Sequence, residues 1–209
     1  MIKESKELLD AMGIPYVQAS SEGEAQAAFM ATNGDVYAVG SQDWDCLLFG
    51  ADKMVKNLTT RKKRKTSGGG RKEVSTELIE LDEVLEDLEI SHEKLVWMGL
   101  LMGTDFNPKG IHGIGPKTAL KLVRKYDDFE ALMEDEKVEW EEENDPYEIK
   151  DFFMDPPVTD IEYENGELDK EKVKEILERH DFSDKRINSG LSDLEKALNS
   201  RQSGLNSFM

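Results

Sequence analysis

Predicted strands and helices alternate along the first ninety residues, and this alternation limits the folds open to the chain. The stretch Ile2–Met12 places apolar side chains on one side of a helix, and Gly13 is suited to ending it. An alanine-rich helix reaching about Thr32 lies between two apolar segments that favour strands. Strands that alternate with helices usually form a parallel sheet with helices on both faces. We therefore predict an α/β fold of that kind.

Few strands are predicted for such a sheet, and the first element is a helix. The predicted strands are Ile14–Val17, Asp35–Gly40, Met54–Leu58 and Glu77–Asp82. Ser21 and Glu24 have the spacing of a capping box at the start of the alanine-rich helix. From Ser91 the pattern becomes helical, over residues 93–103, 117–126, 170–179 and 193–198. The sequence thus divides into an α/β part at 1–90, a helical part at 91–200 and a tail at 201–209.

Charge is distributed unevenly along the chain. Asp and Glu number 45 against 27 Lys and Arg, a net charge of −18, which argues against nucleic-acid binding through overall charge. Nineteen acidic and three basic residues lie between Asp127 and Lys170, and we expect this acidic block to be solvated surface. Between Arg61 and Lys72 there are seven basic residues around three glycines. This basic loop at 61–72 is typical of a phosphate-contacting hairpin tip or of a solvated loop.

Cysteine content and hydropathy indicate where the protein acts. Cys46 is the only cysteine, which excludes an intramolecular disulfide and fits a reducing compartment. No apolar run approaches the roughly 18 residues that a membrane span needs, and the N-terminus has no signal-peptide pattern. We therefore expect a cytoplasmic protein without membrane contact.

Two acidic pairs follow predicted strands. Asp43 and Asp45 come after the strand at Asp35–Gly40, and Glu22 and Glu24 lie at a helix start. Ligands of parallel sheets bind beyond the carboxyl ends of the strands, and Mg²⁺ prefers oxygen ligands. If both pairs meet at one sheet edge, the carboxylates need cations to offset their repulsion. The alternatives are turn residues in the first pair and capping or helix-dipole interactions in the second.

A glycine-rich turn joins two predicted helices. Gly113-Ile114-Gly115-Pro116 precedes the helix at 117–126. Glycines allow close backbone approach to a ligand, and exposed amides at a helix start bind anions. Basic side chains at Lys117, Lys121, Arg124 and Lys125 extend this positive surface. The pattern is typical of helix-hairpin-helix units that bind a phosphate backbone; a plain helical connection is the alternative.

Together, four motifs resemble those of the archaeal-type flap endonuclease family of structure-specific 5′ nucleases. The motifs are Ser21–Ala28, Ser41–Asp45, Gly103–Asn107 and Gly113–Lys117, and the similarity runs from Ile2 to Met209. Four motifs in order and register are far more specific than any one of them. The resemblance implies a PIN-like α/β nuclease core, incomplete at its N-terminus. It also implies a helical DNA-binding region with a helix-hairpin-helix type turn at 103–126.

Site residues follow from the same resemblance. It implies two Mg²⁺ ions held, directly or through water, by Glu22, Glu24, Asp43, Asp45 and Asp105. It implies that the glycine turn holds duplex DNA, and often a K⁺ ion through its carbonyls. The residues that would contact DNA are Arg61, Lys62, Lys63, Arg64, Lys65, Gly113, Gly115, Lys117, Lys121 and Arg124.

The C-terminal tail suggests a protein partner. Gln202, Leu205, Phe208 and Met209 follow the spacing of peptides that dock on the replication sliding clamp. Met209 stands where a second aromatic residue is usual, so we expect weaker docking. A frayed terminus is the alternative.

The main departure from the family is at the N-terminus. The family has an N-terminal region with the first strands, two further metal-binding aspartates and a helical arch, and this sequence begins after it. A truncated start, or a split gene whose N-terminal half is a separate partner polypeptide, would explain this. The resemblance implies a magnesium-dependent 5′ flap endonuclease and 5′–3′ exonuclease, acting by two-metal hydrolysis at single-strand/duplex DNA junctions in replication and repair. The alternative is a non-catalytic module that binds DNA and the sliding clamp and needs a separate N-terminal half.

Overall fold

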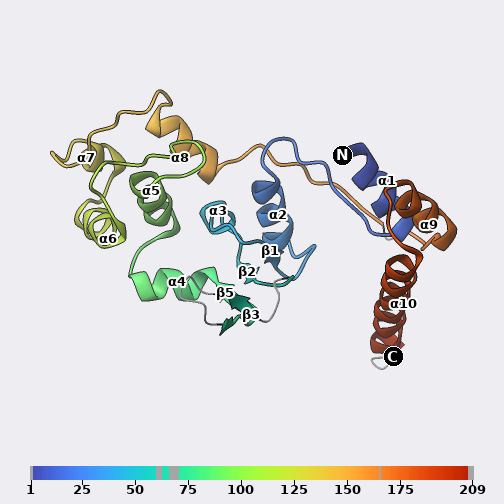
Figure 1. Ribbon diagram of the computed structural model, residues 1–209. Coiled ribbons are helices and arrows are strands. Elements are labelled where there is room, and N and C mark those ends of the chain that lie inside the picture. The colour runs from blue at the N-terminus through green and yellow to red at the C-terminus, as the bar shows by residue number, and fades with distance from the viewer. Residues whose placement is uncertain (1, 60–62, 66–70, 165, 207–209) are drawn as a thin grey trace. The chain divides into compact units, whose positions relative to one another are not determined.

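The structure is a computed structural model that describes residues 2–59, 63–65, 71–164 and 166–206. These residues form two compact units (Figure 1). Unit 1 combines residues 1–18 with 161–209, and unit 2 consists of residues 19–160. The predicted ranges 1–90, 91–200 and 201–209 divide the chain by role rather than by compactness, and they stay a prediction.

Unit 1 is a small helical assembly. It contains α1 (Ile2–Met12), α9 (Lys170–Arg179) and α10 (Asp184–Asn206). Ala11 of α1 is buried together with Val173 and Ile176 of α9. As predicted, α1 ends before Gly13, which has a left-handed φ of +68°. A side chain there is excluded, because a Cβ would lie 2.7 Å from the carbonyl oxygen of Gly166.

A three-stranded mixed sheet lies in unit 2. It consists of β1 (Val39–Gly40), β2 (Lys53–Lys56) and β5 (Glu77–Glu80), in the order β1-β2-β5. The first two strands are parallel, as predicted, but β2 and β5 are antiparallel. Parallel neighbours need a crossover, usually helical, whereas a separate antiparallel pair, β3 (Lys63–Lys65) with β4 (Arg71–Glu73), lies between β2 and β5. That connection explains why a purely parallel sheet was the wrong prediction.

Some local predictions also fail. Residues 14–17 form no strand, because Pro15 has no amide hydrogen for a sheet ladder. The stretch 46–49, predicted only as apolar sequence, largely folds as the short helix α3 (Asp45–Leu48). Helix α2 (Gly23–Thr32) starts after Glu22 rather than after Ser21, so the capping-box prediction is wrong.

The helical part of unit 2 has its own core. Ser91 caps α5 by accepting a hydrogen bond from Lys94 N at 3.3 Å. Buried residues of α5, α6 and α8 pack together, with Leu101, Val123 and Phe153 almost fully enclosed. No helix among the described residues is long and apolar enough to cross a membrane. The helices of this part are α4 (Leu81–Leu88), α5 (His92–Met102), α6 (Pro116–Lys125), α7 (Phe129–Met133) and α8 (Pro146–Met154).

The acidic block is only partly solvated surface. Asp128 and Asp145 cap α7 and α8 through their side chains. Asp135 is 9% exposed and accepts hydrogen bonds from Tyr126 Oη at 2.6 Å and Lys125 Nζ at 3.0 Å. The hydrogen bond from Tyr126, with those from Lys137 N and Lys125, holds the pKa of Asp135 well below its usual range. These acids have structural roles, so the expectation of solvated surface is wrong for this part of the block.

Candidate active site

The five predicted metal ligands lie around one small cavity in unit 2. Its volume is about 50 Å³, and Phe49 and Phe106 complete its lining. Three separate segments of the chain supply the acids, so the cavity exists only in the folded protein. The acidic residues are Glu22 and Glu24 at the start of α2, Asp43 and Asp45 at the start of α3, and Asp105 in the loop after α5.

Local hydrogen bonds involve only some of the side chains in the two acidic pairs. Glu22 is the N-cap residue of α2, but its side chain makes no capping hydrogen bond. Asp43 receives a hydrogen bond at Oδ1 from Asp45 N at 3.4 Å, and its own N donates to Ser41 Oγ at 3.0 Å. The turn interpretation therefore holds in part for Asp43. The side-chain capping interpretation does not hold for Glu22.

A buried polar network fixes the loop that carries Asp105. Asn107 is fully buried, and its Oδ1 accepts hydrogen bonds from Thr104 N at 3.2 Å and Thr104 Oγ1 at 2.7 Å. Its amide nitrogen donates to Leu100 O at 2.7 Å, which ties the loop to the last turns of α5. Because an unpaired buried polar group is costly, this network strongly favours one loop conformation. Asp105 itself stays exposed at the cavity.

The cavity disfavours uncompensated negative charge. Burial, together with the nearby charges of Asp43, Asp105, Glu24 and Glu22, raises the pKa of Asp45 to about 6. Each of these effects penalises the ionised form of the carboxyl group. A bound cation would remove much of the penalty, so the electrostatics favour divalent metal binding.

The donor set suits a hard cation. Among the described residues, no three His, Cys, Asp or Glu side chains converge as ligands of a single ion. Mg²⁺ usually takes only one or two protein carboxylates and completes its shell with water and phosphate. Carboxylate oxygens, which five side chains bring to this cavity, are ligands of the kind that such a cation prefers.

Two aromatic residues that line the cavity were not predicted as site residues from the sequence. Phe49 directly follows α3, and Phe106 directly follows Asp105 in sequence. For Phe106, the position next to a predicted ligand was a signal available in the sequence. Alone, it does not distinguish a cavity wall from an ordinary core residue.

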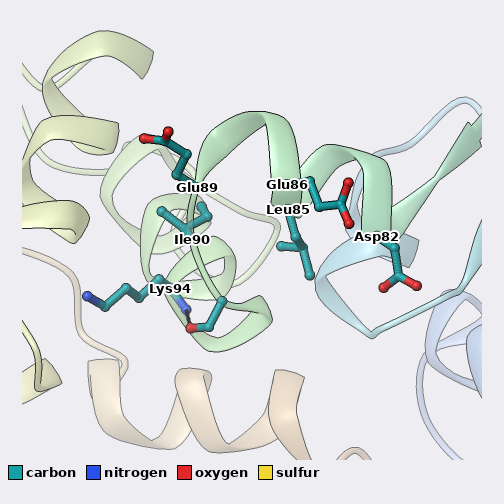
Figure 2. Close-up of a pocket in the computed structure, with 7 residues that line it drawn as sticks. Asp82, Leu85, Glu86, Glu89, Ile90 and Lys94 are labelled. Carbon is teal, nitrogen blue, oxygen red and sulfur yellow. Dashed lines mark hydrogen bonds between the residues drawn. The ribbon is translucent and has the colours of Figure 1, made fainter.

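A second group of acids, on α4 and at its C-cap, lines a different pocket from the predicted ligands. Figure 2 shows Asp82, Glu86 and Glu89 around an open groove of about 490 Å³, with Lys94 also lining it. Glu89 forms an ion pair with Arg124 at 3.4 Å, so part of the negative charge is already compensated. These acids therefore serve best as a control surface for tests of the cavity.

The glycine turn has the predicted local geometry. Gly113 has a φ of +79°, and Gly115 is the N-cap residue of α6, with Pro116 in the first turn. Lys117 and Lys121 are exposed and lie four residues apart on one face of α6. A positive surface at a helix start with free space at both glycines suits a phosphate backbone.

The other predicted DNA-contacting residues have structural contacts, lie in a hairpin strand or fall outside the described residues. Arg124 donates from Nε and Nη2 to Leu88 O, at 3.0 and 2.6 Å, and so caps the end of α4. Lys63, Arg64 and Lys65 form β3 of a hairpin, whereas Arg61 and Lys62 lie outside the described residues. In the tail, Gln202 and Leu205 fall within α10, and Phe208 and Met209 lie outside the described residues.

Comparisons with known proteins agree with this arrangement. Residues 13–105 match the XPG I-region family, a span that includes the five acids. Flap endonuclease 1 of Hyperthermus butylicus is 48% identical over the whole chain, which spans 61% of that relative's length.

Solved structures show the same fold. Flap endonuclease-1 from Methanococcus jannaschii superposes with a TM-score of 0.80 at 42% identity, over 96% of this chain and 59% of that one. The Holliday junction-resolving enzyme GEN1, in complex with product DNA and Mg²⁺, shares the fold at 21% identity and a TM-score of 0.63, over 86% of this chain and 51% of that one. These matches confirm the predicted fold class. The chain thus carries an XPG I-region and is similar along its whole length to flap endonucleases.

Proposed function

We propose that the chain acts as a magnesium-dependent, structure-specific nuclease, which hydrolyses a phosphodiester bond at a single-strand/duplex junction such as a 5′ flap. The observation that carries the proposal is the convergence of five carboxylates from three segments on one cavity. A relative named flap endonuclease 1 supports the substrate class. A neighbour of the same fold solved with product DNA and Mg²⁺ supports the ion.

Each part of the site has a separate task. Glu22, Glu24, Asp43, Asp45 and Asp105 would hold two Mg²⁺ ions, which when bound supply an activated water and stabilise charge on the leaving oxygen. Asn107 keeps the Asp105 loop in one conformation. Phe49 and Phe106 give the cavity two apolar walls.

Cleavage of a labelled 5′-flap duplex tests the assignment. We expect incision near the junction that requires Mg²⁺ and stops when a chelator is added. Junction binding without any incision would contradict the nuclease assignment and support the DNA- and clamp-binding module. Failure to bind the junction even at low salt would contradict both.

The face of α6 yields a prediction about DNA affinity. The combined change Lys117→Ala and Lys121→Ala should reduce the slope of log affinity against log salt by about 2, because each phosphate contact contributes about 0.9. Fluorescence anisotropy over a salt series measures this slope. Lys137→Ala, at an exposed lysine of the acidic block, is the control and should leave it unaltered. Equal slopes in the wild type, the double variant and the control would show that these α6 lysines do not contact DNA.

The tail yields a prediction about the sliding clamp. Removal of residues 202–209 should weaken clamp binding by at least about tenfold, because a few apolar anchors dominate such interfaces. Surface plasmon resonance with immobilised clamp measures the affinity. Ser203→Ala, between the residues of the predicted spacing, is the control. An unchanged affinity after removal would show that the clamp does not bind there.

A further inference from the structure

Residues 144–159, here called the strap, run past all three segments that carry the acids. The strap includes α8 and lies within the acidic block, far in sequence from the predicted ligands. Its contacts with these segments are ring packing and hydrogen bonds between polar groups. It is therefore part of the framework around the cavity.

The strap begins at the Asp105 loop. Asn144 Nδ2 donates a hydrogen bond to Phe106 O at 2.8 Å. Asn144 O in turn accepts from Trp140 Nε1 at 2.8 Å, which fixes the start of the strap. The backbone directly after Asp105 is therefore held from outside its own loop, in addition to the Asn107 network inside it.

Two rings of α8 connect the Asp105 loop with α3. The Phe152 ring lies 5.0 Å from Phe106 and 5.9 Å from Phe49, measured between centroids. The Phe153 ring lies 5.5 Å and 4.6 Å from the same two rings and is 1% exposed. Phe49 and Phe106 both line the carboxylate cavity. The α8 rings thus fill the space behind two walls of the cavity and set the distance between them.

The strap ends at α2. Gln26 Nε2 donates to Thr159 O at 2.8 Å, and Thr159 N donates to Gln26 Oε1 at 3.0 Å. Gln26 is 3% exposed and lies two residues after Glu24 in α2. Breaking this reciprocal pair without replacement is costly, because it leaves the buried Gln26 amide unpaired. The helix start that carries Glu22 and Glu24 is therefore tied to the same segment as the other acids.

From these contacts we infer that Phe152, Phe153 and Gln26 are positioning residues, through which the strap sets the spacing of the five carboxylates and so their affinity for divalent cations. The inference rests on the proposed metal-binding function. Residues behind a metal site commonly change affinity about 10- to 100-fold when altered, because ligand orientation depends on them. The strap extends this dependence to a segment outside the matched I-region, residues 13–105.

The test measures Mn²⁺ binding in the absence of DNA, using the electron paramagnetic resonance signal of free Mn²⁺ as the readout. Phe152→Leu keeps an apolar side chain at a half-buried position but removes the ring contacts with Phe49 and Phe106, and should weaken Mn²⁺ binding about tenfold. Phe152→Tyr retains the ring and should bind Mn²⁺ with wild-type affinity. The matched control is Tyr147→Leu, which removes a ring of the same helix that packs on Phe129 instead, at 5.2 Å.

The outcomes separate the two proposals. Equal Mn²⁺ affinity in the wild type, Phe152→Leu and Tyr147→Leu would overturn the strap inference and leave the metal site intact. A wild type that binds no Mn²⁺ would overturn the metal site, and the strap inference with it. Gln26→Met, which removes both hydrogen bonds to Thr159, gives a second variant at the other end of the strap. It should also weaken Mn²⁺ binding, while thermal unfolding confirms that each variant is folded.

Discussion

Replacing Asp43 by asparagine should reduce Mg²⁺-dependent flap cleavage by about a thousandfold. Asp43 and Asp45 lie on one of the three segments that bring acids to the cavity. An asparagine side chain carries no charge to offset that of a divalent ion. Loss of about 4 kcal/mol of transition-state stabilisation corresponds to that factor and is within the range that metal ions contribute. Single-turnover cleavage of a labelled flap measures the rate of the chemical step.

The matched control for Asp43→Asn is Asp82→Asn in the acidic group on α4 (Figure 2). It removes the same charge from a surface outside the cavity and should leave cleavage within about twofold of wild type. Junction binding, measured with a chelator present, should be the same in both variants. Equal losses of cleavage in the two would mean that overall charge, rather than the cavity, controls activity.

Replacing Gly110 by alanine should lower the free energy of unfolding by about 4 kcal/mol, a loss that only a few mechanisms produce. Gly110 has a φ of +56°, and a Cβ there would lie 2.5 Å from Met102 C and 2.6 Å from Met102 O. These are backbone atoms of the end of α5, so no rotamer change can relieve the overlap. Urea denaturation measures the loss, and Mn²⁺ affinity should fall as well, because the loop that Gly110 closes carries Asp105.

A neighbouring glycine separates overlap from backbone strain. Gly113 also has a left-handed φ, of +79°, but a Cβ there meets nothing within 4 Å. Gly113→Ala should therefore cost only about 1 kcal/mol, the usual penalty of a left-handed residue. Similar losses for the two variants would show that the close approach between Gly110 and α5 does not matter.

Where a signal is local, the sequence alone predicted the structure well. The helix at Ile2–Met12 ends before Gly13, and α6 follows a glycine with proline in its first turn. One failure occurred where the connection between strands decides. Strand β5 pairs antiparallel with β2 because a hairpin rather than a helix precedes it. Pairing direction depends on the connection, which residue patterns describe poorly.

The acids of the candidate site were predictable, but their support was not. The predicted site residues lie close to motifs with recognisable spacing, and the structure places the five acids around one cavity. Gln26 and Thr159 are 133 residues apart in sequence. Phe152 and Phe153 belong to an acidic block whose composition suggests solvated surface. Such long-range pairs have no local signature, and the chain must fold before they can be seen.

The central claim is that these five carboxylates, and not the other acids of a chain with 45 of them, hold the divalent ions. The most direct test is paramagnetic broadening of backbone amide signals in a ¹⁵N-labelled sample titrated with substoichiometric Mn²⁺. We predict that the signals of Glu24, Asp45 and Asp105 disappear first, while those of Asp82 and Glu86 on α4 persist. Equal broadening at both groups, or earlier loss at Asp82 and Glu86, would contradict the account.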